Sequence, residues 1–167
     1  MKRFIVIALV LVIIAAAGYV YLIPKAQRKY RAFICASGLY GLGQIMLRYN
    51  NDHDGNFPTP TKWCDLLDKQ EAETITLFVR CRGASEGPCN YAMNKAIAKT
   101  PVPPDIVVLF ETHPGWNQSG GPEILTTDYH EGEGCNVLFA DLHVKFVKTK
   151  DLGDMKWHAA NSEAEKP

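Results

Sequence analysis

The hydrophobic pattern begins with an unbroken apolar run from Phe4 to Ile23, preceded only by Met1, Lys2 and Arg3. About twenty residues at ~1.5 Å rise per residue match the ~30 Å hydrocarbon core of a bilayer. The run has no polar face at the 3.6-residue period, whereas a core helix of a water-soluble domain would have one. We therefore predict a basic N-terminus over residues 1–3 and a transmembrane segment over residues 4–23.

Two alternatives to a retained, outward-facing anchor stay open at this point. A cleaved signal peptide would end at the small residues Ala15–Ala17, before Gly18. The apolar run continues to Ile23, so its full length fits a span better than an excised segment. A cytoplasmic position for the C-terminal part is the second alternative, because the basic residues after the span outnumber those before it. These residues are Lys25, Arg28, Lys29 and Arg31.

Residues 24–50 predict an amphipathic helix. Apolar positions recur there at three- and four-residue intervals: Cys35, Leu39, Leu42, Ile45 or Met46, and Tyr49. Proline kinks a helix without necessarily ending it, so a single long bent helix can pass through Pro24. Gly38, Gly41 and Gly43 each weaken that helix by up to ~1 kcal/mol relative to Ala. Some other element must therefore pack closely on the glycines, and we expect a sheet there.

Residues 51–104 read as a loop and cysteine region. Asn50, Asp52 and Asp54 with Gly55 resemble the start of a calcium loop, but Thr61 stands where an EF-type loop needs a bidentate Glu. A helix terminus is the favoured interpretation of this segment. Residues 61–69 predict a short helix with Thr61 as its cap, and residues 90–104 predict irregular backbone.

Residues 105–150 predict a small antiparallel sheet. Three β-branched and aromatic runs mark its strands: Ile106–Phe110, Cys135–Ala140 and Val144–Val147. The last two runs are joined so tightly that only an antiparallel hairpin can connect them. A long helix followed by clustered antiparallel strands is an α+β fold. The polar tail, residues 158–167, is predicted to be disordered.

Composition and charge limit the classes of partner that the chain is expected to bind. Lys plus Arg equals Asp plus Glu at 18 each, and no basic stripe is interleaved with aromatic residues. We therefore expect no nucleic-acid partner. The basic cluster after the span is better explained by lipid headgroups. The residues after the span have room for one domain, which we place at residues 24–157.

The five cysteines suggest an oxidising compartment. They are Cys35, Cys64, Cys81, Cys89 and Cys135. Cys81 and Cys89 enclose a short Gly/Pro loop that a disulfide could close, although Cys64 or Cys135 could pair with either, and connectivity is not readable from sequence. No close C-x-x-C pair is present, so structural disulfides or buried thiols are favoured over a metal, and no cofactor is expected.

Two segments together resemble bacterial pilin-like, type II secretion pseudopilin-like proteins. The segment VLFETHPGWNQSGGPEILTTDYHEGEGCNVLFADLHVKFV is similar to their C-terminal region, whose motif is His, nine residues and then Asp-Gly. The segment ICASGLYGLGQIMLRYNNDHDGNFP is similar to their helix. The matches cover most of residues 35–147. The resemblance implies one N-terminal anchor helix in the bacterial inner membrane, with its outer half packed on an antiparallel sheet in the extracytoplasmic space.

The chain departs from that family pattern at two places. Ten residues separate His130 from Asp141, and Leu142 stands where the family has glycine. Leucine with positive φ costs on the order of 1 kcal/mol, so we predict a different turn type or a bulge before His143. The N-terminal run also lacks the processing glycine and the glutamate of prepilins, so filament assembly and prepilin processing do not follow from the resemblance.

These observations predict a non-enzymatic, single-pass, pilin-like structural or assembly protein. Its expected partners are the bilayer and, by resemblance, other pilin-like subunits or secretion machinery. An extracytoplasmic glycan- or peptide-binding module is the alternative, and it would need Trp116 to point outward from its loop. A metal-dependent hydrolase is a further alternative, and it would need His130, Asp141 and His143 to converge on one pocket.

Overall fold

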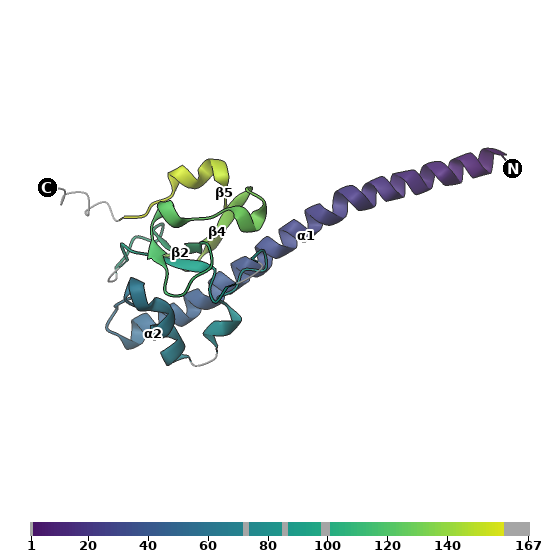
Figure 1. The fold of residues 1–167 in the computed structure, drawn as a ribbon. Helices are drawn as coiled ribbons and strands as arrows, with labels where there is room; N and C mark the ends of the chain where they lie inside the picture. The colour runs from purple at the N-terminus through teal and green to yellow at the C-terminus, as the bar shows by residue number, and fades with distance from the viewer. Residues whose placement is uncertain (1, 72–73, 85–86, 98–100, 159–167) are drawn as a thin grey trace.

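The computed structural model describes residues 2–71, 74–84, 87–97 and 101–158 (Figure 1). Two α-helices and five strands form its frame: α1 (Lys2–Asp52), α2 (Trp63–Gln70), β1 (Tyr91–Asn94), β2 (Val107–Glu111), β3 (Ser119–Gly120), β4 (Gly134–Phe139) and β5 (Val144–Lys148). Five short 3-10 turns connect them: η1 (Pro60–Lys62), η2 (Ile75–Leu77), η3 (Pro122–Ile124), η4 (Asp128–His130) and η5 (Thr149–Asp154). Apart from His158, the tail predicted to be disordered lies outside the described residues.

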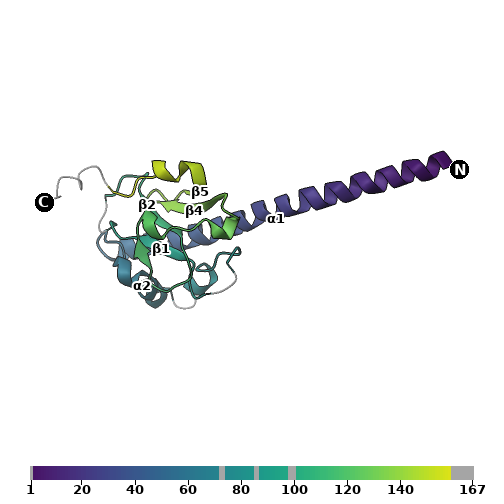
Figure 2. The ribbon, with the colours of Figure 1, turned by 45° about the horizontal axis from the view of Figure 1, so that its top comes forward.

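Helix α1 is one continuous helix of 51 residues that passes through Pro24 without a break. Its first half projects from the domain as a bare rod, and its second half lies against the domain (Figures 1 and 2). The side chains from Phe4 to Ile23 are exposed on every side of the rod. This half is long and apolar enough to cross a membrane.

The second half of α1 buries the face predicted from its spacing. Leu39 and Leu42 are fully buried, and Tyr49 is nearly so. Beyond Tyr49 the helix ends in a hydrogen-bonded turn, in which the Gly55 N–H donates to the Asn50 carbonyl at 2.9 Å. Asp54 and Gly55 take positive φ there, as residues that end helices commonly do. The side chain of Asp52 accepts a hydrogen bond from Gln70 at 2.8 Å, which fits a helix terminus.

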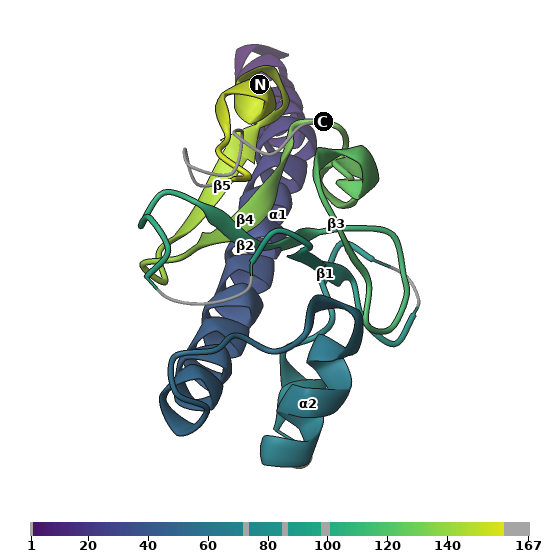
Figure 3. The ribbon, with the colours of Figure 1, turned by 90° about the vertical axis from the view of Figure 1, so that its left-hand side faces the viewer.

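The five strands form one sheet in the order β3-β1-β2-β4-β5. All neighbouring strands are antiparallel except β1 and β3, which pair in parallel. Helix α1 crosses one face of the sheet (Figure 3). A second apolar cluster covers the other face, where Trp157 packs edge-on against Phe110. The α+β class is therefore confirmed, with the sheet buried between α1 and the C-terminal segments.

Strand β1 corrects the prediction that residues 90–104 are irregular. Tyr91 and Met93 face α1, while Ala92 faces the opposite cluster. Both faces are buried, so the strand lacks the alternation of apolar and polar residues that marks a half-exposed strand. Strand β2 contains a register shift between Val107 and Leu109. This irregularity lets the adjacent residues Val108 and Leu109 both join the cluster around α1.

The β4–β5 hairpin is confirmed, and, as predicted, its turn is not a two-residue type I′ turn, but Leu142 takes the positive φ that leucine was expected to avoid. Phe139 N–H donates to the His143 carbonyl at 3.0 Å, and Leu142 N–H donates to the Phe139 carbonyl at 2.9 Å. Leu142 has φ 69°, which is the left-handed position that commonly ends a three-residue hairpin loop. A leucine pays about 1 kcal/mol for that conformation where glycine would not.

We expected a sheet to cover Gly38, Gly41 and Gly43 of α1, but the segment around Phe78 covers two of them. A Cβ at Gly38 would lie 2.9 Å from the Phe78 carbonyl oxygen, and one at Gly41 would lie 2.6 Å from the Phe78 ring. Gly43 meets the sheet, where Leu138 of β4 would be 3.1 Å away, and a Cβ at Gly38 would also lie 3.4 Å from the hydroxyl of Tyr91 of β1. The segment after η2, rather than the sheet alone, therefore requires the small residues.

We predict that Gly38→Ala destabilises the domain by about 1 kcal/mol. Alanine improves helix propensity by up to ~1 kcal/mol, but overpacking against a backbone carbonyl costs about 1–3 kcal/mol. Gly153→Ala is the matched control, because a Cβ there meets no atom within 4 Å. Thermal unfolding of the full chain in detergent, followed by circular dichroism, measures both changes. Equal melting temperatures for the two variants would contradict the packing account.

Candidate functional site

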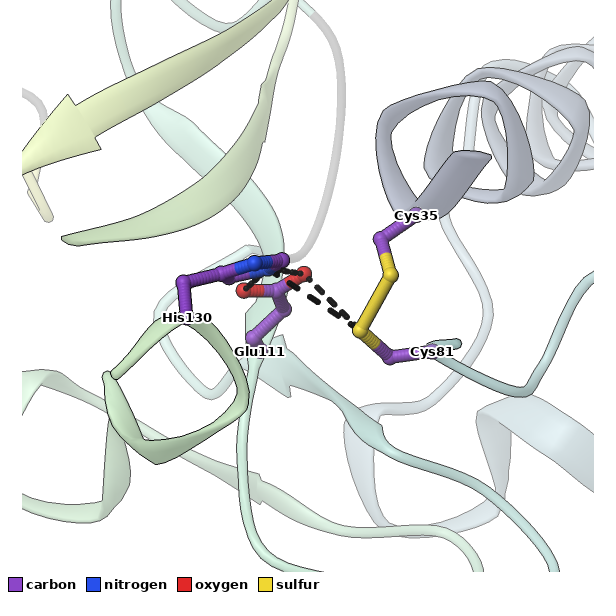
Figure 4. Close-up of side chains that lie close together, drawn as sticks. All are labelled: Cys35, Cys81, Glu111 and His130. Carbon is purple, nitrogen blue, oxygen red and sulfur yellow. Dashed lines mark hydrogen bonds and ion pairs between the residues drawn. A yellow bond between two sulfur atoms is a disulfide. The ribbon is translucent and has the colours of Figure 1, made fainter. Parts of the chain in front are cut away.

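Four segments that are far apart in the sequence bring Cys35, Cys81, Glu111 and His130 together (Figure 4). We call these four residues the neck cluster, because they lie where α1 leaves the domain. Cys35 comes from α1, Glu111 from the end of β2, and His130 from η4. One ligand-type atom from each residue lies within 4.8 Å of the other three, and all four residues are buried.

The carboxylate of Glu111 is the centre of the cluster and is fully buried. His130 Nε2 lies 3.0 Å from Glu111 Oε1. Asn136 of β4 donates twice to the same carboxylate, through its backbone N–H at 3.0 Å and its side-chain amide at 2.9 Å. Buried carboxylates are retained only when such donors replace water. The Asn136 amide also lies 3.2 Å from the Ala32 carbonyl of α1, which ties the sheet to the helix.

A disulfide joins Cys35 to Cys81, with a Cα–Cα distance of 4.8 Å. The predicted pairing of Cys81 with Cys89 is therefore wrong. The structure brings Cys81 to a helix residue 46 positions earlier in the chain, a proximity that local spacing does not reveal. The Cys81 sulfur also lies 3.5 Å from Glu111 Oε1 and 3.9 Å from His130 Nε2.

The remaining cysteines are buried thiols. A hydrogen bond from Cys64 lowers the pKa of Cys89, and that bond together with burial raises the pKa of Cys64. Burial, followed by the nearby Glu111 carboxylate, raises the pKa of Cys135. The Tyr91 hydroxyl donates to the Cys35 carbonyl at 3.1 Å, and burial raises the pKa of Tyr91. A reactive thiol would need the opposite environment, so Cys64 and Cys135 fit structural roles.

A cavity of ≈ 390 Å³ opens beside the neck cluster and reaches the part of α1 around Arg28 and Lys29. His130 and Asn136 line its inner end, and Ala32 and Phe33 line the helix side. Arg28 crosses its rim and pairs with Glu131 at 3.1 Å and with Glu133 at 3.0 Å. These exposed pairs contribute little stability, but they place opposite charges at the entrance.

The three residues of the hydrolase alternative do not share one cavity. His130 lines the cavity at the neck, whereas His143 lines a separate one. Asp141 and His143 interact with each other at the hairpin turn, with 2.5 Å between Oδ1 and Nδ1. Desolvation raises the pKa of Asp141, but the backbone and side-chain hydrogen bonds of His143 outweigh it and lower the pKa overall. The pair therefore closes the turn.

The side chain of Trp116 is 37 % exposed, and hydrogen bonds join its loop to α2. The indole Nε1 donates to Asp65 Oδ1 at 2.5 Å. Asn117 Oδ1 accepts the N–H groups of Cys64 at 2.8 Å and Asp65 at 3.2 Å, so it caps α2 from a distant loop. The predicted Thr61 cap is wrong, because Thr61 lies in η1 and α2 begins at Trp63. These hydrogen bonds hold the loop against the N-terminus of α2 and stabilise that helix.

Glu111 and Asn136 are the two site residues that the sequence interpretation missed. Each occupies an inward position on a strand that is otherwise apolar. Burying a charged side chain costs free energy unless it has a hydrogen-bonding or charged partner. A glutamate within an apolar strand was therefore the one sign in the sequence that a partner lay nearby. Its partners, however, lie on other segments and can be identified only from the folded chain.

Comparisons with known proteins do not place the chain in a family. No protein-family model matches it, and neither curated proteins nor solved structures show a significant match.

We predict that Glu111→Ala destabilises the domain by about 3 kcal/mol, because it leaves the Asn136 and His130 groups buried without their acceptor. Glu123→Ala is the control. Its carboxylate is exposed and pairs with Lys95 at 2.8 Å, so its loss costs at most ~1 kcal/mol. Denaturant unfolding of both variants under oxidising conditions measures the difference. Similar midpoints for the two variants would contradict a structural role for the buried carboxylate.

Proposed function

We propose that this chain is a membrane-anchored, pilin-like structural or assembly protein. Its anchor would be the apolar half of α1, and its domain would face the extracytoplasmic side. The Cys35–Cys81 disulfide supports that side, because disulfides persist in oxidising compartments. The continuity of α1 from the anchor into the core supports a structural role, since one helix would fix the position and orientation of the domain relative to the membrane.

One observation carries the assembly role: the outer face of α1 stays apolar beyond the membrane. Tyr30 and Phe33 are each 66 % exposed, Tyr40 is 53 % exposed, and Leu47 is 40 % exposed. We call these four residues the outer stripe. Their spacing follows the alternating three- and four-residue intervals of a helix–helix seam, with polar residues at positions 37 and 44. The domain core packs on the opposite face of α1, and only Phe33 of the stripe also lines the cavity at the neck, so the stripe is left for another molecule.

A second copy of this chain is the occupant that fits best. The stripe continues the lipid-facing surface of the same helix, so two anchors that meet in the bilayer would bring two stripes together along one axis. A solvent-exposed apolar row of this length is a liability on a monomer. Lys25, Lys29 and Arg31 beside the span would meet lipid headgroups and hold the helix at a fixed depth.

The chemistry-bearing residues fit this role better than catalysis. Glu111 and His130 are buried around a disulfide, and Asp141 and His143 close a hairpin turn. Trp116 donates a hydrogen bond to Asp65 of α2, which favours a structural role for the loop over glycan binding by the indole ring. Secretion machinery stays a candidate partner through the sequence resemblance.

We predict that a photo-crosslinking residue in place of Tyr40 yields covalent dimers in membranes. Phe33→Lys combined with Leu47→Lys should reduce that yield at least about tenfold, because burial of one such side chain contributes about 1.5–3 kcal/mol. The measurement is the dimer fraction on denaturing gels after irradiation of membranes at low expression. Both lysine substitutions are at exposed positions, so the domain should keep its melting temperature.

Leu77 provides the matched control for the crosslinking position. It is 76 % exposed but lies on η2, which is not part of α1. A photo-crosslinker at Leu77 should give no dimer. Equal dimer yields at both positions, or no dimer from the Tyr40 position, would contradict assembly through the outer stripe.

A further inference from the structure

We propose that reduction of the Cys35–Cys81 disulfide converts the neck cluster into a tetrahedral zinc site. The four residues supply two sulfurs, one imidazole nitrogen and one carboxylate oxygen, which is a ligand set that Zn²⁺ prefers. This inference is independent of the assembly role, because it concerns the chemistry of the neck and not the outer face of α1.

The distances already approximate the edges of a zinc tetrahedron. Zn–S bonds of about 2.3 Å and Zn–N or Zn–O bonds of about 2.0–2.2 Å place ligand atoms roughly 3.3–3.8 Å apart. The Cys81 sulfur lies 3.5 Å from Glu111 Oε1 and 3.9 Å from His130 Nε2, and these last two atoms are 3.0 Å apart. The Cys35 sulfur lies within 4.8 Å of these atoms, so after reduction it has to move away from the Cys81 sulfur and settle at a similar distance from all three.

The surroundings of the cluster suit a bound metal. The Arg82 backbone N–H points at the Cys35 sulfur at 3.0 Å, where it would stabilise a thiolate ligand. Asn136 holds the Glu111 carboxylate with two N–H donors, which is how outer partners orient a ligating carboxylate. The cavity at the neck gives a cation access to the inner end of the cluster, where His130 and Asn136 line it.

The net charge of the neck cluster is also the same in the disulfide form and in the zinc form. The zinc form differs from the disulfide form by two thiolate charges and one Zn²⁺. The two negative charges and the two positive charges cancel, so the net charge of the cluster stays the same. The buried site can therefore exchange a disulfide for a metal without gaining net charge, which would otherwise be costly in the core.

The conversion is a two-electron reduction followed by metal binding. An external dithiol attacks the disulfide, gives up two electrons and two protons, and leaves as its own disulfide, while Cys35 and Cys81 become thiols. Zn²⁺ then displaces one proton from each thiol, and both protons go to solvent. His130 binds through Nε2 as the neutral tautomer with its proton on Nδ1.

The test compares oxidised and reduced full-length protein in detergent, with Co²⁺ and Zn²⁺ as probes. A phosphine reductant keeps the thiols reduced without adding thiol ligands. We expect reduced protein to bind one metal per chain, and its Co²⁺ form to show the visible bands of tetrahedral cobalt with a sulfur-to-cobalt charge-transfer band. Oxidised protein should show neither. Reduced protein that binds no metal, or that unfolds and is not restored by Zn²⁺, overturns the proposal.

Single substitutions identify which side chains bind the metal. Cys35→Ser should remove most of the charge-transfer intensity, and His130→Gln should shift the visible bands. Asn136→Ala should keep the spectrum but weaken affinity about 10–100-fold, because it removes an outer partner and no ligand. Cys64→Ser is the matched control, since this buried thiol lies outside the cluster. Loss of binding in Cys64→Ser, or full binding in Cys35→Ser, would assign the metal to other residues and overturn the site.

Discussion

The structure depends on one helix whose first half is apolar on every side and whose second half packs into the domain core. Up to Ile23 the side chains of α1 are apolar all round, as hydrocarbon requires, and from Cys35 one face is buried in the domain core. A break between the two halves would separate anchor from fold. Pro24 removes one backbone donor at this place, yet the helix stays continuous through it. A segment long and apolar enough to cross a membrane and the packing face of the domain consequently belong to a single element, so the orientation of one constrains the other.

The neck cluster joins this helix to the sheet. The Cys35–Cys81 disulfide and the Asn136 contact with the Ala32 carbonyl both connect α1 to segments that arrive much later in the chain. Glu111 makes the junction specific, because a buried carboxylate tolerates only an arrangement that brings its donors together. The same requirement concentrates metal-ligating atoms at the neck, so a structural junction and a redox-dependent metal site can use the same residues.

Sequence reasoning predicted the parts of this fold whose signals are local. The spacing of Leu39, Leu42 and Tyr49 identified the buried face of α1, and the tight β4–β5 connection identified the hairpin. Strand β1 was missed because it is buried on both faces. The Cys35 partner and the Asn117 cap of α2 were missed for a different reason: each is set by contact between distant segments. Of the candidate site, His130 and Cys81 were named in advance and Cys35 was placed on the buried face of α1, whereas Glu111 was missed because its role depends on donors from β4 and η4.

The central claim is that the apolar half of α1 is retained and is continuous with the folded domain. N-terminal sequencing of the protein, after extraction from washed membranes with mild detergent, tests it most directly. The account predicts an N-terminus at or before Phe4, with the domain absent from the soluble fraction. A mature N-terminus at Gly18, with the domain released in soluble form, would contradict it.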